Sequence, residues 1–329
     1  MGEKSRPPTR GTHLPRLLTL TRGAVGAALS RGPGYEPQPV GLNTRHDRVS
    51  GYYLDLRRKA AAELRPRVTG RGEMILPGPT ATAQRALGLH EAWLMGDQKA
   101  FEGFLEEAQR LRDRAIEVGT SLLWQYDVDV PKFRQRAPWY SCMAQGQAAS
   151  AFVRAHIATK QEYWAEAALA AVHPLVVDGE RLGLVTATPY GPALEEATTN
   201  PPSRILNGWI FGLWGLWDVA IGLTDAHCRG LFNASTEALA QMLAAYDVGW
   251  WTRYSLFPPV APDLAKPFYH TLHVAQISAL FSLTGIADFG DYAERWRAYD
   301  RFRNRARAVA SKASSVLGEF RRERAGTIA

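Results

Sequence analysis

The sequence has only two cysteines, Cys142 and Cys228, among its 329 residues. They lie far apart, each inside an apolar segment with helical spacing. The sequence therefore excludes a disulfide framework and a cysteine-rich metal site, and it predicts two buried free thiols. A glycine-rich phosphate loop and the glycine fingerprint of dinucleotide-binding folds are also missing. Chemistry that depends on a bound nucleotide is therefore not indicated, and we predict that no cofactor is needed.

Long uninterrupted apolar runs are missing too. The best candidate for a targeting segment is Leu14–Ser30, but Arg16 and Arg22 interrupt its apolar run. Neither a membrane span nor a standard signal peptide is supported by such a segment. We therefore predict a cytoplasmic protein without a membrane span.

Acidic residues are outnumbered by basic ones. Lys and Arg total 39, Asp and Glu total 32, and the formal net charge is +7. The excess lies near the N-terminus and again over Arg295–Gly326. This charge suits a solvated tail, a contact to a second subunit in a homodimer, or attraction of a polyanionic substrate. We predict no nucleic-acid partner, because no helix-turn-helix, zinc-finger or aromatic strand motif accompanies the charge.

Apolar residues, in contrast, are plentiful. They make up 46% of the chain, which also holds 10 Trp, and a chain of this length can bury a large core. Their three- and four-residue spacing predicts helices in four successive pairs. The pairs are Ala81–Leu94 with Ala100–Val118, Ser141–Thr159 with Glu162–Val172, Arg204–Leu223 with Leu231–Tyr246, and Tyr269–Leu283 with Asp291–Val316.

Paired helices in regular succession predict a mainly α fold, an (α/α) toroid that forms an incomplete barrel of helical hairpins. Ile205–Ala220 is apolar on nearly every side, as expected for a helix of the inner layer, and its tryptophans should be core residues. We predict a basic N-terminal arm at residues 1–48, the toroid at 49–300, and a basic C-terminal helix and tail at 301–329. A short strand is expected at Gly51–Lys59 and a loop at Gly70–Pro79.

Side chains that could take part in binding or catalysis cluster at the predicted starts of the inner helices. The three segments are Ala137–His156 (APWYSCMAQGQAASAFVRAH), Leu194–Gly208 (LEEATTNPPSRILNG) and Ala245–Ile277. Ser141 can cap a helix, and Gln145 and Gln147 offer amides for a sugar or for the backbone. Glu195 and Glu196 precede a Pro-rich turn and Ser203, which is predicted to cap the next helix, and this position should direct them towards the mouth of the ring.

Each feature also has a purely structural interpretation. Paired carboxylates in a loop are commonly just solvated, and a tyrosine at a helix start commonly anchors the helix. His270 and His273 could merely cap the preceding turn. A His-x-x-His pair can bind zinc, but no third ligand lies nearby in the sequence, so no metal site is predicted.

Together these segments resemble the C-terminal catalytic domain of the D-glucuronyl C5-epimerases, over about Gly51–Tyr299. The similarity rests on WYSCMAQGQ, on LEE with the following PPS and LNG, on the YDVG turn, and on the YHTLH helix start. The resemblance implies a helical toroid. It also implies cofactor-free inversion of the carbon that bears the carboxylate in a uronic acid, within a heparosan-like polysaccharide or a glycoside.

The resemblance also implies roles for single residues. Tyr254 and Tyr269 become the acid/base candidates, with Glu196 as a partner in proton transfer. The implied substrate-binding residues are Gln145, Asn207, Tyr246, His270, His273, Arg85 and Arg253. The reaction suits such groups, because one proton donor or acceptor is needed on each face of the sugar and cations must neutralise the carboxylate. A phenol, with a reference pKa of about 10, is a strong base once ionised.

Three positions depart from the family pattern. Ala197 stands where the family commonly has Tyr, Phe257 where it has Arg, and Arg85 where it has Tyr. Arg85 or Arg253 could supply the carboxylate-binding charge from another wall. Two other functions therefore stay open. One is a uronate lyase that expels the C4 substituent from the same carbanion, and the other is a toroid that binds an anionic sugar or a partner protein without turnover.

Overall fold

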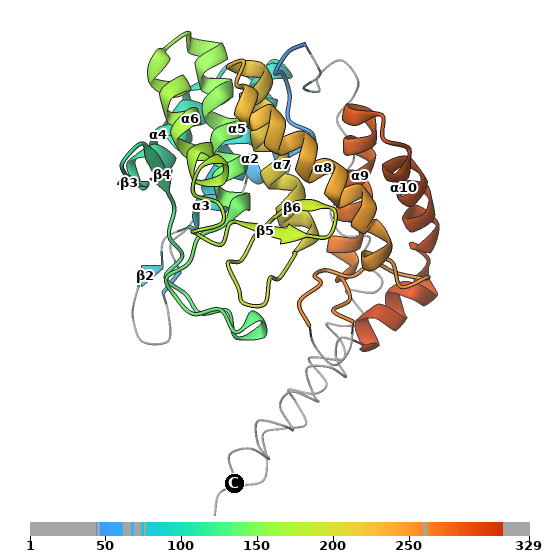
Figure 1. The fold of residues 1–329 in the computed structure, drawn as a ribbon. Helices are drawn as coiled ribbons and strands as arrows, with labels where there is room; N and C mark the ends of the chain where they lie inside the picture. Colours follow the sequence, from blue (N-terminus) through green and yellow to red (C-terminus); the bar gives the residue numbers. More distant parts are fainter. Residues whose placement is uncertain are drawn as a thin grey trace, which may run out of the picture.

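The computed structural model describes residue 44 and residues 47–61, 67–68, 74–75, 77–258 and 262–311. Nearly all of the predicted arm at residues 1–48, and the tail beyond residue 311, lie outside the described residues. Helices dominate the described part (Figure 1), as predicted. Within that part, no helix is long and apolar enough to cross a membrane.

The helices are joined by short loops and three small sheets. The helices are α2 (Arg57–Ala60), α3 (Pro79–Leu94), α4 (Ala100–Asp113), α5 (Cys142–Thr159), α6 (Glu162–Val176), α7 (Leu206–Gly222), α8 (Ala226–Tyr246), α9 (Pro267–Thr284) and α10 (Ala287–Tyr299). The antiparallel strand pairs are β1 (Arg67–Val68) with β2 (Met74–Ile75), β3 (Ile116–Val118) with β4 (Ser121–Leu123), and β5 (Val185–Thr188) with β6 (Gly191–Leu194). A single 3₁₀ turn, η1 (Pro131–Phe133), lies between β4 and α5, and residues 302–311 of the described ranges are helical as well.

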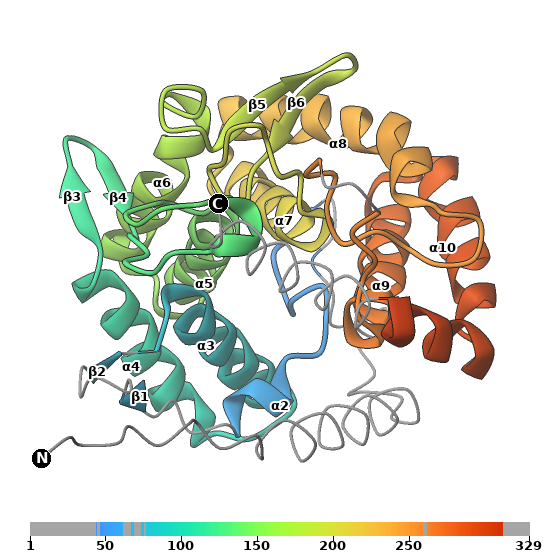
Figure 2. The ribbon, with the colours of Figure 1, turned by 90° about the horizontal axis from the view of Figure 1, so that it is seen from below.

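The helical hairpins follow one another around an open ring. Helices α3, α5, α7 and α9 form the inner layer, and α4, α6, α8 and α10 form the outer layer (Figure 2). Neighbouring inner helices contact one another in chain order, from α3 to α9. This arrangement confirms the predicted toroid of helical hairpins.

Local signals place the helix ends. Ser141 caps α5 as predicted, because its hydroxyl accepts a hydrogen bond from the Ala144 amide at 3.5 Å. Pro79 and Pro267 occupy the first positions of α3 and α9, where a missing N–H has no intrahelical partner to lose. Gly285 ends α9 with a φ of 69°, a conformation that glycine adopts without a steric penalty.

Several predicted elements are wrong in detail. Gly51–Lys59 is not a strand, because Tyr52, Tyr53 and Leu54 are all buried in the core and the segment then turns into α2. Helix α4 stops at Asp113, and the β-branched residues of Ile116–Val118 form β3 instead.

The other corrections concern a loop and a cap. The predicted loop Gly70–Pro79 contains strand β2 and the first residue of α3. Ser203 does not cap α7, whose N-cap is Ile205; its hydroxyl donates to the Glu195 carboxylate instead. The bond to a buried carboxylate is charge-assisted and thus stronger than a cap bond to a neutral amide.

Helices α5 and α7 pack backbone against backbone. A Cβ added at Gly146 of α5 would lie 2.7 Å from the carbonyl oxygen of Phe211 and 2.8 Å from the Cα of Gly212 in α7. A Cβ added at Gly215 would collide with the backbone of Gly146. Only glycine fits at these positions, since contacts below 3.0 Å to rigid backbone cannot relax through side-chain motion.

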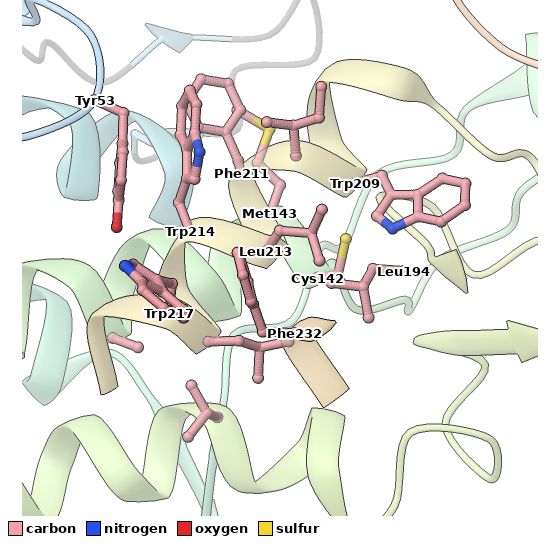
Figure 3. Packing of buried hydrophobic residues seen from close by; sticks show 14 of the residues in the cluster. Tyr53, Cys142, Met143, Leu194, Trp209, Phe211, Leu213, Trp214, Trp217 and Phe232 are labelled. Carbon is pink, nitrogen blue, oxygen red and sulfur yellow. The ribbon is translucent and has the colours of Figure 1, made fainter. Parts of the chain in front are cut away.

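Aromatic side chains of α7 fill the space around this contact (Figure 3). The ring of Trp214 stacks on Tyr53 with centroids 4.5 Å apart, and Trp209 Nε1 donates to Ser235 Oγ of α8 at 2.8 Å. Both tryptophans are fully buried, so the prediction that they belong to the core is confirmed. Cys142 and Cys228 are buried and free, also as predicted.

A buried ion pair joins α5 to α7. Arg154 Nη1 donates to Asp218 Oδ2 at 2.6 Å, and the two side chains are 1% and 0% exposed. Arg154 also donates to the carbonyls of Ser50 and Gly51, and the Tyr53 hydroxyl donates to Asp218 at 2.9 Å. The pair thereby fixes the segment before α2 inside the ring, and removing one partner would leave an uncompensated buried charge.

The close contact between α5 and α7 leads us to predict how a substitution there changes stability. Gly215→Ala should lower the free energy of unfolding by about 2 kcal/mol, because the methyl group forces α5 and α7 apart. Gly230→Ala is the matched control: Gly230 lies in α8 with nothing near its Cβ position, so alanine should stabilise by about 0.5–1 kcal/mol. Urea unfolding followed by circular dichroism measures both values. Equal stability of the two variants would contradict the backbone contact.

Candidate active site

A cavity of about 310 Å³ opens among the first turns of the inner helices. Its volume is in the range of small-molecule sites. The residues that line it are Lys59, Thr80, Gln84, Tyr126, Trp139, Ser141, Met143, Glu196, Asn207, Phe211, Phe268, Tyr269 and Leu272. Of the predicted site residues, the cavity brings Glu196, Asn207 and Tyr269 together, and Tyr254 lies directly behind Tyr269.

Glu196 follows β6 and lies against the start of α7. A Cβ at Gly208 would be 2.7 Å from Glu196 Cγ, so the glycine makes room for this side chain. Asn207 Nδ2 donates to Glu196 Oε2 at 3.1 Å. Burial raises the pKa of the Glu196 carboxyl to about 7, while the bonds from Asn207 and Tyr254 and the charge of Lys132 act to lower it. The carboxyl therefore changes its charge near neutral pH.

Tyr254 and Tyr269 are in contact, with ring centroids 4.6 Å apart. Burial raises the pKa of Tyr254 well above its ordinary value, and the charge of Glu196 raises it further. The pKa of Tyr269 is raised by the same two causes, in the same order. Both phenols are therefore protonated at neutral pH, and Glu196 is the adjacent group that can take up a proton from them.

Lys132 is a cation at this site that the sequence analysis missed. It lies in η1, and its Nζ is 4.7 Å from the centroid of the Tyr254 ring. Lys132 also pairs with Asp263 Oδ2 at 2.6 Å, and its side chain is 41% exposed. Nothing in the sequence VPKF marks this lysine, because it reaches Tyr254 from a loop far away in the chain.

A second missed group lies on the α3 side of the cavity. Tyr126 stacks on Trp139 with centroids 4.3 Å apart and an interplanar angle of 11°. Its hydroxyl shares a hydrogen bond of 2.7 Å with Thr80 Oγ1 of α3. Burial raises the pKa of Tyr126 to about 12. The cavity thus has a phenol on each of two walls.

Glu195 and Gln145 are buried and hydrogen-bonded to other parts of the protein. Glu195 is fully buried and accepts from Ser203 Oγ at 3.0 Å and from the Arg204 amide at 2.7 Å, so it does not point to the mouth of the ring. Gln145 is fully buried as well, and its Nε2 donates to the carbonyls of Leu122 and Ala171 at 2.7 Å each. Neither side chain lines the cavity.

Tyr246, His270 and His273 are also placed away from the cavity. The Tyr246 hydroxyl donates to the Arg204 carbonyl at 2.8 Å. His270 lies between the Thr252 hydroxyl at 2.9 Å and the Trp296 carbonyl at 3.0 Å, and burial lowers its pKa to about 4. His273 is completely buried, and burial lowers its pKa too. These side chains hold the turn before α9 in place and do not contact the cavity.

The two arginines proposed for the substrate carboxylate do not line the cavity either. Arg85 Nε donates to Glu107 Oε1 at 3.0 Å, and its guanidinium also bonds to the Ala60 carbonyl. Arg253 pairs through its backbone with Leu264. Lys59 lines the cavity, and Lys132 lies near it, over the Tyr254 ring.

The two apolar departures from the family pattern lie together under the site. Ala197 and Phe257 are buried in one small cluster with Phe133, and Tyr254 packs against it. Phe257 meets Phe133 edge to face, with centroids 5.6 Å apart. The side of the site where the family has a phenol and a guanidinium is therefore apolar in this protein.

Among the described residues, no group of three or more His, Cys, Asp or Glu side chains is arranged to hold a metal ion. His270 and His273 both direct Nδ1 to the Thr252 hydroxyl. Separately, the contacts of Glu196 with Tyr254 and of Tyr254 with Tyr269 allow protons to pass between a carboxyl and phenols.

The raised pKa of Glu196 can be tested without a substrate. In ¹³C NMR of glutamate-labelled protein, the Glu196 carboxyl should titrate with a midpoint at about 7. Asn207→Ala should move the midpoint higher, because the amide bond stabilises the ionised carboxylate. Glu91 also has a pKa raised to about 7 by burial, so Glu196→Gln is needed to identify the resonance. A midpoint near the ordinary glutamate value of about 4.3 would contradict the buried setting.

Comparison with known proteins identifies the family. The family model for the D-glucuronyl C5-epimerase C-terminus matches residues 118–298. A D-glucuronyl C5-epimerase of Caenorhabditis elegans is 30% identical over 177 residues, which cover 49% of this chain and 29% of the worm protein. An uncharacterized protein of Methanocaldococcus jannaschii is 25% identical over 183 residues, covering 54% of this chain and 58% of that protein.

The chain thus spans less than two thirds of either relative. The family match, however, covers more than half of the chain and includes the Glu196, Tyr254 and Tyr269 cluster. It also contains helices α5 to α9 in full, which form most of the ring. This chain belongs to the D-glucuronyl C5-epimerase C-terminal domain family.

Proposed function

We propose that the protein is a carbohydrate epimerase that moves a proton at C5 of a uronic acid residue without a cofactor. The observation that carries the proposal is the contact of Glu196, Tyr254 and Tyr269 at one wall of a cavity large enough for a sugar residue. Family membership supports a C5-epimerase-like activity. An anionic polysaccharide or a uronoside is the proposed substrate.

Tyr269 is the phenol of this cluster that lines the cavity, so it is the proposed contact to C5. In the proposed step the C5–H bond breaks and its electron pair moves into the adjacent carboxylate. The proton passes to the Tyr269 oxygen while the phenolic proton moves through Tyr254 towards Glu196. Glu196 must be ionised to accept it, so the rate should rise as the pH increases through about 7.

Lys132 is the proposed partner of the substrate carboxylate. The carbanion places extra negative charge on that carboxylate, and a fixed cation stabilises the charge most when water is excluded. The ammonium of Lys132 lies over the Tyr254 ring and pairs with Asp263. In the proposed complex it leaves Asp263 and pairs with the substrate carboxylate. Trp139 and Phe268 offer flat apolar faces for the sugar ring.

Isotope exchange tests the reaction. Incubation with heparosan-type polymer, and then with other uronosides, in deuterated water should place deuterium at C5 and produce the epimer. Tyr254→Phe and Glu196→Gln should each lower the rate by about 100-fold or more, as expected for loss of a proton-transfer group. Absence of exchange with every uronoside would reject the proposal, and growth of ultraviolet absorbance from an unsaturated product would show a lyase instead.

The role of Lys132 has a separate test. Lys132→Met should lower kcat/KM by about 10- to 100-fold, the cost of losing a charge-assisted contact, and Lys132→Arg should restore part of it. Lys99→Met, on the exposed surface before α4, is the control with the same chemical change. Rates on a uronoside and on its carboxamide, which keeps an acidic C5–H but carries no negative charge, complete the test. An equal loss of kcat/KM on both would contradict a contact to the carboxylate.

A further inference from the structure

Inversion at C5 needs a proton acceptor on one face of the sugar and a donor on the other. Tyr254 and Tyr269 cannot supply both, because their rings touch and Glu196 adjoins both of them. Tyr269, in the first turn of α9, lines one wall of the cavity, and Tyr254 contacts its ring. The group for the opposite face must therefore come from another wall.

The facing wall is built from α3 and the loop after β4. Thr80 and Gln84 of α3 line the same cavity as Tyr269 of α9. These two helices are the first and the last of the inner layer, and they lie on opposite sides of the centre of the ring (Figure 2). Among the described residues that line the cavity, Tyr126 is the tyrosine on the side opposite Tyr269.

Tyr126 is held rigidly in this position. Its amide donates to the Trp139 carbonyl at 2.8 Å, and the Trp139 amide donates back at 3.2 Å. The two rings stack in parallel, and the Tyr126 hydroxyl is bonded to Thr80 at 2.7 Å. Preorganisation of this kind is what a proton-transfer group requires, because its oxygen must stay in place while the proton moves.

The charge state of Tyr126 fits a proton donor. Burial first, and the charge of Glu196 to a lesser extent, raise the pKa of Tyr126, whereas the bond to Thr80 lowers it. Glu196 also raises the pKa of Tyr269, so this carboxylate influences phenols on both walls. Tyr126 and Tyr254 pack against the same apolar cluster beneath the cavity, which includes Ala197.

We propose that Tyr126, oriented by Thr80, is the second proton-transfer residue and serves the face of C5 opposite to Tyr269; this assignment rests on the proposed epimerase activity. When Tyr269 and Glu196 have removed the C5 proton, the carbanion takes the phenolic proton of Tyr126. The new C5–H bond forms on the other face, and the O–H electron pair stays on the Tyr126 oxygen. Solvent then returns a proton to this phenolate and removes one from Glu196.

Other polar groups of this wall are less suited. Gln84 donates to Gln147, and the Ser141 hydroxyl accepts the capping bond of α5. Lys59 of α2 lines the cavity and carries protons, so it is the rival donor. It is included in the test for that reason.

Deuterium exchange with each epimer separates the two faces. The probes are heparosan-type polymer, which contains D-glucuronate, and its L-iduronate-containing epimer, each in deuterated water. The wild-type protein should label both. Tyr126→Phe should label only the epimer whose C5 proton faces Tyr269, and net inversion should fall by about 100-fold or more. Tyr269→Phe should show the reverse pattern, and Thr80→Val should lower inversion less than Tyr126→Phe does.

Control variants separate a specific loss of proton transfer from a general loss of folding. Tyr163→Phe removes a hydroxyl bonded to Gln109 on the outer surface and should leave both rates unchanged. Circular dichroism and the melting temperature show that each variant is folded. Wild-type inversion by Tyr126→Phe, loss of labelling of both epimers in the folded variant, or one-sided labelling by Lys59→Met would each overturn the assignment. No labelling of these polymers or of any other uronoside by the wild-type protein would reject the proposed function and this assignment together.

Discussion

The backbone contact between α5 and α7 is the constraint on which the rest of the structure depends. Gly146 and Gly215 let the two helices approach until no side chain fits between them. The aromatic residues of α7 are thereby forced to the flanks of the contact, where they fill the space to α8 and to the segment before α2. The buried pair of Arg154 and Asp218 then crosses the same helix interface and fixes that segment.

The same contact decides where the reactive carboxyl lies. Gly208 lies in the first turn of α7, and the Glu196 side chain occupies the space that a Cβ would take there. The Gly208 carbonyl in turn accepts a hydrogen bond from Cys142 Sγ of α5 at 3.4 Å. Glu196 is consequently held against two helix starts in a poorly solvated place, and this burial is the main cause of its raised pKa.

Hydrophobic spacing predicts the toroid, whereas the carboxyl–phenol cluster is implied by the resemblance to the epimerase family. Asn207 and Tyr269 lie at helix starts that the periodicity already locates, and Glu196 lies in the segment between β6 and α7. Side-chain direction could not be predicted in the same way. His270 belongs to the same motif as Tyr269, yet it points into the core, where Thr252 and the Trp296 carbonyl satisfy both ring nitrogens.

Residues that reach the site from distant parts of the chain could not be predicted from the sequence. Lys132 and Tyr126 belong to the loops between β4 and α5, and no local pattern distinguishes a lysine over a ring from a solvated one. Their importance depends on contacts with Tyr254 and with Thr80, which are separated from them by many residues. Such pairings follow from the closure of the ring and only become visible once α3 and α9 face each other.

The apolar departures from the family pattern and Lys132 form one arrangement. Phe257 packs on Phe133 of η1, and the neighbouring Lys132 extends over the rings of Phe133 and Tyr254. An arginine at position 257 would bring its own charge, but it could not offer η1 the same aromatic contact. The phenylalanine therefore removes one cation and, by fixing η1, positions another beside Tyr254. A change of residue type can thus leave a positive charge at the site, with a different segment of the chain supplying it.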